Sequence, residues 1–147
     1  MHIALIGCGE VGRCLAAALG SVGEVELTIC EKNDTPATQA FIRSQHATSH
    51  ASLGNWLTEC DAVFSCVVGA CAQEVAEEAA GRMRPGAAYL DVTTASPRAM
   101  QNASRSFAEK GIGFVDVAIM GAIASNGIAT PLLIAGDTSM PTVGETL

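Results

Sequence analysis

Residues 1–12 read MHIALIGCGEVG, and this stretch decides the fold. The run over residues 2–6 is short and apolar without alternation, as in a strand that is buried on both faces. It leads directly into GCGEVG, a GxGxxG pattern at residues 7–12, and then into a stretch of helical period that ends at Gly20. A buried strand, a glycine-rich turn and a helix in this order predict a binding site for the pyrophosphate of a dinucleotide.

Each glycine of the turn has a distinct mechanical task. Gly7 permits the tight turn, Gly9 removes a side chain where a pyrophosphate approaches, and Gly12 lets the helix pack closely on the strand. The N–H groups at the start of the helix then face the diphosphate. The alternative is a strand-to-helix turn without a ligand. The residues predicted to contact the cofactor here are Gly7, Cys8, Gly9, Glu10, Val11 and Gly12.

Beyond the turn, apolar runs bounded by turn residues alternate with helical stretches. This alternation predicts a single α/β domain of the Rossmann type, a doubly wound and mostly parallel sheet with helices on both faces. A short strand and a short helix are expected within residues 46–56, and one further apolar run covers residues 131–135. The other predicted strands cover residues 25–30, 61–68, 87–92 and 112–117, and the other helices start at residues 36, 72 and 97.

Composition excludes several classes of partner. The chain has 147 residues, which is the size of one domain, and a net charge of −7 with two lysines and six arginines that do not cluster. Binding to a nucleic acid or to a membrane surface would need a basic patch on the protein, so we expect neither partner.

The start of the chain does not resemble a signal peptide, and we expect a cytoplasmic protein.

The six cysteines lie in apolar runs without CxxC spacing, and we interpret them as reduced core residues rather than as disulfides or metal ligands. We expect no metal site. Cys66 and Cys71 bracket a loop on the predicted cofactor side, so a reactive thiol is the alternative interpretation there.

An acidic residue, Glu31, stands nineteen positions after Gly12 at the end of the second predicted strand. Its carboxylate would accept hydrogen bonds from the adenosine ribose and repel a 2′-phosphate, which favours NAD over NADP. Lys32 and Arg43 are close in sequence and weaken this preference. The alternative is that Glu31 and Lys32 form only a solvated strand end.

The ends of later parallel strands should border the same ligand. The hydroxyls of Thr93 and Thr94 could contact the nicotinamide ribose or carboxamide. Equally, Thr94 or Ser96 could serve only to cap the following helix.

Four ordered motifs, GCGEVG, DVTTASP at 91–97, GIGFVDVAIMGA at 111–122 and SNGIATPLLIAGD at 125–137, resemble the β-hydroxyacid dehydrogenase family. This family includes 3-hydroxyisobutyrate dehydrogenases and the cofactor domain of 6-phosphogluconate dehydrogenase, and the DVAIM variant is most similar to its phosphogluconate-dehydrogenase-like branch. The resemblance implies hydride transfer between a nicotinamide and a small hydroxy acid. It also implies that Val67 and Val68 flank the cofactor and that Thr94 lies near the nicotinamide.

Two departures from the family pattern limit this interpretation. Met120 stands where the family has a serine that holds the substrate carboxylate, and a thioether cannot donate a hydrogen bond. Backbone groups of Gly121 and Ala122 could still bind substrate, and plain packing is our preferred interpretation of Met120. In addition, the family's general acid/base lysine lies on a long interdomain helix that follows the cofactor domain and precedes a helical second domain, whereas residues 138–147 contain no lysine.

We therefore expect a dinucleotide-binding domain over residues 1–137 and, over residues 138–147, a tail that leads toward a helical domain not included in this chain. The expected partners are a small-molecule substrate and either further copies of the chain or the missing domain. Histidines are expected to be structural, and the catalytic residue is unknown. The alternative function is a non-catalytic module that senses a nucleotide or supplies a subunit interface. An S-adenosylmethionine site is a further alternative, which the third glycine of the motif disfavours.

Overall fold

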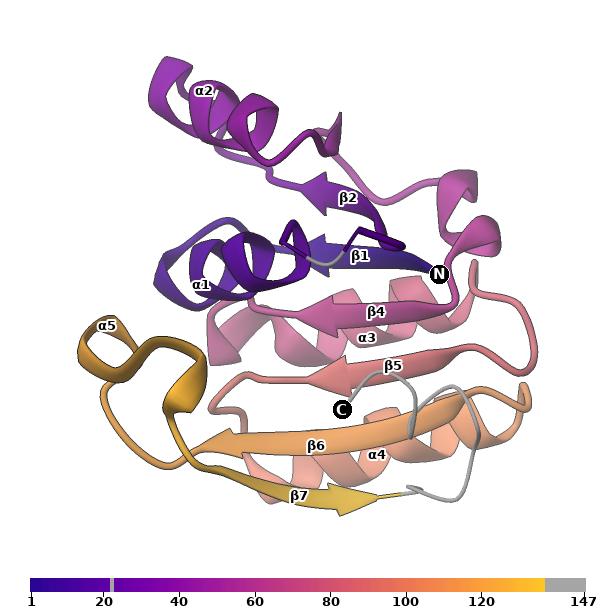
Figure 1. The fold of residues 1–147 in the computed structure, drawn as a ribbon. Helices are drawn as coiled ribbons and strands as arrows, with labels where there is room; N and C mark the ends of the chain where they lie inside the picture. Colours follow the sequence, from indigo (N-terminus) through magenta and orange to yellow (C-terminus); the bar gives the residue numbers. More distant parts are fainter. Residues whose placement is uncertain (22, 137–147) are drawn as a thin grey trace.

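A seven-stranded sheet with the order β3-β2-β1-β4-β5-β6-β7 forms the centre of the molecule (Figure 1). The computed structural model describes residues 1–21 and 23–136. Six strands run parallel, and β7 pairs antiparallel with β6 at one edge. The strands are β1 (His2–Ile6), β2 (Glu26–Cys30), β3 (Thr48–His50), β4 (Ala62–Ser65), β5 (Ala88–Asp91), β6 (Gly113–Ile119) and β7 (Leu132–Gly136).

Helices cover both faces of this sheet, as the alternating pattern predicts. Helices α1 and α2 pack on one face, where Ile42 joins a cluster with Leu5 and Ile29, and α3 and α4 pack on the other, where Phe107 lies against Tyr89. The helices are α1 (Glu10–Leu19), α2 (Pro36–Ser44), α3 (Ala72–Ala80), α4 (Pro97–Ala108) and α5 (Ile123–Asn126), with 3-10 turns η1 (Asn55–Glu59), η2 (Gly69–Cys71) and η3 (Gly127–Ala129). The predicted Rossmann-type, doubly wound architecture is confirmed.

Two helices start at the caps that their sequences predict. The Thr35 hydroxyl accepts a hydrogen bond from the Thr38 N–H at 3.1 Å, and the Ser96 hydroxyl accepts one from the Ala99 N–H at 3.3 Å. A proline follows each cap, where its missing N–H costs nothing.

Two predicted strand ends differ from the structure by two residues or more. The strand expected over residues 61–68 ends at Ser65, because the chain leaves the sheet there and enters η2. The strand expected to end at residue 117 continues to Ile119, because β7 pairs with residues 115–119 of β6. Residues 117–119 therefore extend past Asp116, which pairs with the last residue of β5 (Figure 1). The predicted domain boundary after residue 137 lies outside the described residues.

Candidate dinucleotide site

The turn between β1 and α1 is built around two glycines that no larger residue could replace without a shift. Gly7 has a φ of 102°, and a Cβ there would lie 2.8 Å from the Cys66 carbonyl oxygen. A Cβ at Gly12 would lie 2.1 Å from the Gly7 carbonyl oxygen. Helix α1 thus starts in direct contact with the end of β1, which is the close packing that the motif predicts.

Gly9 differs from these two glycines because its side-chain position is open. A Cβ built on Gly9 meets no heavy atom within 4 Å. Gly9 is also the N-cap of α1 and has no side chain to cap the helix. A ligand can therefore approach the backbone at this point.

The first N–H groups of α1 provide hydrogen-bond donors for such a ligand. The Arg13 N–H donates to the Gly9 carbonyl oxygen at 2.9 Å, which is the first bond of the helical ladder. Within residues 1–21 and 23–136, the N–H groups of Glu10, Val11 and Gly12 have no acceptor. Together with the positive end of the helix dipole, they fit the pyrophosphate of a dinucleotide. The exposed Glu10 carboxylate adds negative charge to the same turn.

Glu31 follows β2 and its carboxylate bonds to two backbone N–H groups. One oxygen accepts from Cys8 N–H at 2.7 Å, and the other accepts from Asn33 N–H at 2.7 Å. Because each carboxylate oxygen can accept more than one hydrogen bond, ribose hydroxyls could still bind there. The Glu31 side chain is therefore hydrogen-bonded to the glycine turn and is not simply solvated at the end of β2, whereas Lys32 is exposed.

Arg13 also supports this turn, although it is not among the predicted site residues. Its Nε donates to the Cys8 carbonyl oxygen at 3.0 Å, and another guanidinium nitrogen donates to the Thr38 hydroxyl at 3.3 Å. The guanidinium also lies 4.7 Å from the centre of the Phe41 ring. Arg13 thus ties α2 to the glycine turn. An arginine directly after the motif was a signal, but its partners lie about 25 residues away in sequence.

At the ends of β4 and β5, the structure separates the roles left open for Thr94 and Ser96. Ser96 caps α4. Thr94 is exposed, and its hydroxyl has no hydrogen-bond partner in the described part of the chain. The Val68 side chain is 70% exposed, while Val67 packs partly against the core. Thr94 and Val68 are therefore available for contact with a ligand.

Met120, Gly121 and Ala122 lie directly after β6. The side chain of Met120 is 59% exposed, so the packing interpretation of this residue is wrong. The longer β6 explains the difference, because it carries Met120 beyond the ends of its neighbours and the Met120 N–H then bonds to the Pro131 carbonyl oxygen at 2.8 Å. A Cβ at Gly121 would lie 3.3 Å from the Thr130 side chain.

Two buried or partly buried carboxyl groups occupy the last paired level of β5 and β6. Asp91 is 0% exposed, and Asp116 pairs with it across the strands. Burial raises the pKa of Asp91, and the charge of Asp116 adds to this effect. Burial also raises the pKa of Asp116. Asp91 was not among the predicted site residues, although an acid at the end of an apolar run was a signal.

Three of the six cysteines are buried, and Cys14 and Cys66 are only partly buried. Cys8, Cys30 and Cys60 are buried, as predicted, whereas Cys71 is exposed, so its interpretation as a core residue is wrong. Cys71 lies in η2, outside the sheet. Burial raises the pKa of Cys66 to about 12, which keeps it a protonated thiol near neutral pH and disfavours a reactive thiolate at that position.

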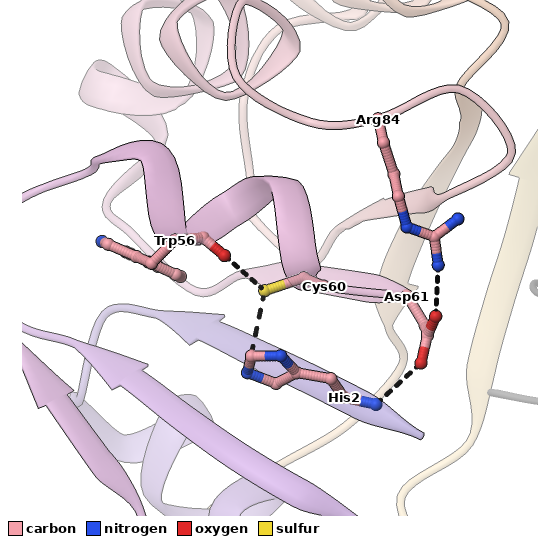
Figure 2. A network of polar contacts seen from close by, with 5 residues as sticks. All are labelled: His2, Trp56, Cys60, Asp61 and Arg84. Carbon is pink, nitrogen blue, oxygen red and sulfur yellow. Dashed lines mark hydrogen bonds and ion pairs between the residues drawn. The ribbon is translucent and has the colours of Figure 1, made fainter.

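A second polar network lies at the amino ends of the parallel strands, opposite to the glycine turn (Figure 2). The Nε2 atom of the His2 ring lies 2.9 Å from the Thr28 hydroxyl, and the backbone N–H of His2 donates to the Asp61 carboxylate at 2.8 Å. Arg84 also bonds to Asp61. Burial raises the pKa of Cys60 to about 12, so it remains a thiol beside His2. These contacts join β1 to the start of β4, which fits the predicted structural role of His2.

Comparison with known proteins identifies what this arrangement is similar to. Residues 2–142 match the family model described as the NAD binding domain of 6-phosphogluconate dehydrogenase. No curated protein matches the chain. None of the helices described in the structure is long and apolar enough to cross a membrane.

Three solved structures illustrate the similarity. The conserved protein MTH1747, of unknown function and with structural similarity to 3-hydroxyacid dehydrogenases, is 30% identical over 91% of this chain and 49% of its own, with a TM-score of 0.78. A 3-hydroxyisobutyrate dehydrogenase from Salmonella typhimurium is 20% identical over 99% of this chain and 52% of its own, with a TM-score of 0.83. An imine reductase from Myxococcus stipitatus in complex with NAD⁺ is 20% identical over 95% of this chain and 47% of its own, with a TM-score of 0.76. The chain thus spans about half the length of these proteins.

Proposed function

The chain belongs to the family of the NAD-binding domain of 6-phosphogluconate dehydrogenase, and from this premise we propose that it binds the pyrophosphate of NAD or NADP at the turn of residues 7–12. The observation that carries the proposal is the open position above Gly9 beside helix N–H groups without an acceptor in the described chain. Gly7 and Gly12 keep the turn in this shape. Arg13 and Glu31 hold it from the side of α2 and β2.

We propose NAD as the preferred cofactor. The Glu31 carboxylate lies at the glycine turn, where it would accept from ribose hydroxyls and repel a 2′-phosphate. Calorimetric titration with NADH and NADPH tests this preference. Replacement of Glu31 by Gln should increase the affinity for NADPH relative to NADH. The ratio is the informative quantity because Gln keeps only one acceptor oxygen, so one of the two bonds from Cys8 N–H and Asn33 N–H is lost with either ligand. An unchanged ratio would argue against a role of Glu31 in selecting the cofactor.

The proposed reaction is hydride transfer between the nicotinamide and a small hydroxy acid or a related substrate. The nicotinamide supplies the hydride chemistry when bound. The residues of this chain would bind and orient it, with Val67, Val68 and Thr94 beside the nicotinamide end and the backbone of Met120, Gly121 and Ala122 toward the substrate. The exposure of Val68 and Thr94 supports this assignment.

A non-catalytic nucleotide-binding module is the second candidate. Two observations favour it. Lys110 lies between α4 and the start of β6, near Gly81 and away from the carboxyl ends of the parallel strands, and Lys32 lies on the adenosine side of the predicted site. Met120 offers no hydrogen-bond donor on its side chain. NADH binding followed by turnover after addition of a helical domain that carries a lysine would support the enzyme, and binding without turnover would support the module.

We also propose that a further protein surface covers β7. Leu132, Leu133 and Ile134 are 49%, 62% and 37% exposed, which is unusual for large apolar side chains on one strand. Either a second copy of the chain or a further domain after the cofactor domain would bury them. Sedimentation of the 147-residue chain distinguishes the two, because a concentration-dependent dimer favours the second copy and a monomer favours the further domain. We propose the cytoplasm as the compartment.

A further inference from the structure

Three polar side-chain atoms on β4 and β5 are buried and have no hydrogen-bond partner among the described residues. They are Ser65 Oγ, the Tyr89 hydroxyl and Asp91 Oδ2. Ser65 pairs directly with Asp91 across the two strands, and Tyr89 is two residues before Asp91. Because side chains alternate along a strand, all three lie on the face that α3 and α4 cover. Buried polar groups are rarely left without a hydrogen-bond partner, so this cluster needs an explanation.

Asp91 is the member of this group that connects to a loop. Its second oxygen, Oδ1, accepts a hydrogen bond from the Thr93 N–H at 2.9 Å. The Thr93 hydroxyl in turn accepts one from the Ala95 N–H at 3.3 Å. These two bonds fold residues 93–95 into a turn that leaves Thr94 exposed between them. The conformation of the turn therefore depends on the carboxyl group of Asp91.

The same turn contacts the loop that follows β4. A Cβ at Gly69 would lie 3.0 Å from the Thr94 carbonyl oxygen and 3.2 Å from the Ala95 nitrogen. The two loops touch so closely that a shift of one must move the other. Val68, adjacent to Gly69, is 70% exposed. The carboxyl of Asp91 thus sets where Thr94 and Val68 stand relative to each other.

We propose that Asp91 is a positioning residue for the nicotinamide half of the bound cofactor, acting through the Thr93–Ala95 turn and its contact with Gly69. This inference rests on the proposed function. It concerns only one half of the ligand, because the glycine turn and Glu31 hold the pyrophosphate and adenosine half. Burial and the neighbouring Asp116 raise the pKa of Asp91, because both disfavour its charged form.

The test compares two ligands that differ in the nicotinamide. ADP-ribose carries the adenosine and the pyrophosphate of NADH and lacks the nicotinamide. Replacement of Asp91 by Ala removes the acceptor for Thr93 N–H, and we expect the affinity for NADH to fall about 5- to 10-fold while that for ADP-ribose changes less than about 2-fold. Replacement of Asp91 by Asn keeps an acceptor oxygen and should restore NADH binding to within about 2-fold of wild type.

Two further variants make the test robust. Thr93→Val removes the acceptor for Ala95 N–H and should show the same selective loss of NADH affinity. It therefore provides the test even if Asp91→Ala fails to fold. Asp61→Ala is the matched control, because it removes an acid that bonds to backbone N–H at the amino ends of the parallel strands (Figure 2). We expect it to lower stability and leave the ratio of the two affinities unchanged.

The outcomes separate this inference from the proposed function. If the wild-type chain binds neither NADH nor ADP-ribose, both are refuted. If the wild type binds both ligands and Asp91→Ala weakens them equally, or weakens neither, only the role of Asp91 is refuted.

Discussion

Replacement of Gly9 by Ala tests the proposed pyrophosphate site most directly. The protein itself should accept the methyl group, since no heavy atom lies within 4 Å of the added Cβ and the Gly9 backbone is extended at φ −76° and ψ −160°. Alanine is a poorer N-cap than glycine but lowers the entropy of the unfolded chain. The free energy of unfolding should therefore change by less than about 0.5 kcal/mol.

Cofactor binding should respond very differently. The added methyl group would stand where the pyrophosphate meets the backbone, and forcing a methyl group into a packed contact costs about 1–3 kcal/mol. This corresponds to NADH binding that is about 5- to 150-fold weaker. Urea unfolding measures the stability and calorimetric titration measures the dissociation constant on the same preparation.

Two glycine variants serve as controls for this measurement. Gly23→Ala adds a methyl group that also meets no heavy atom within 4 Å, and it should leave both stability and NADH affinity unchanged. Gly12→Ala places a Cβ 2.1 Å from the Gly7 carbonyl oxygen and should lower stability by about 2 kcal/mol or more. If the Gly9 variant binds NADH as tightly as the Gly23 variant, the pyrophosphate does not bind at this turn.

Three other measurements address charge, burial and packing. Glu10→Gln removes a negative charge beside the helix N-terminus and should tighten NADH binding about 2- to 5-fold at low salt, with a smaller effect at high salt; equal affinities at low salt would contradict this. Burial raises the pKa of Asp91 in the folded state, so the folded protein binds this proton more tightly than the unfolded chain and stability decreases as pH rises through that window. Asp91→Asn should therefore gain stability relative to wild type as the pH rises above about 4 in urea unfolding, and a pH-independent difference would exclude this explanation. Phe107→Ala removes a fully buried ring that stacks on Tyr89 and should cost about 3–5 kcal/mol of unfolding free energy, and a loss below about 1 kcal/mol would show that the core of this face is not tightly packed.

The parts of the fold that depend on neighbouring residues could be predicted from the sequence. The β1–turn–α1 unit is local, and its glycines, apolar run and helical period all lie within 20 residues. The caps at Thr35 and Ser96 are local for the same reason. The family membership follows from motifs of the same kind.

The parts that depend on distant contacts could not be predicted. The extension of β6 and the exposure of Met120 depend on antiparallel pairing with β7, which a parallel βα pattern does not indicate. The Arg13 contacts need α2 to lie beside the glycine turn. Asp91 stands out in the sequence only as an acid at the end of an apolar run, and only the register of β4 and β5 shows that it pairs with Ser65.

Residues 117–119 of β6 have a hydrogen-bonded neighbour on one side only among the described strands, because β5 ends at the level of Asp116. At about 3.3 Å per residue, this two-stranded segment reaches about 10 Å beyond the rest of the sheet. Isolated pairs of strands are only marginally stable, so its amide hydrogens should exchange with solvent sooner than those of residues 113–116 in the same strand. Met120 and the two residues after it are thus attached to the less protected end of β6, where, under the proposed function, they could adapt to substrates of different size while the turn of residues 7–12 keeps its position.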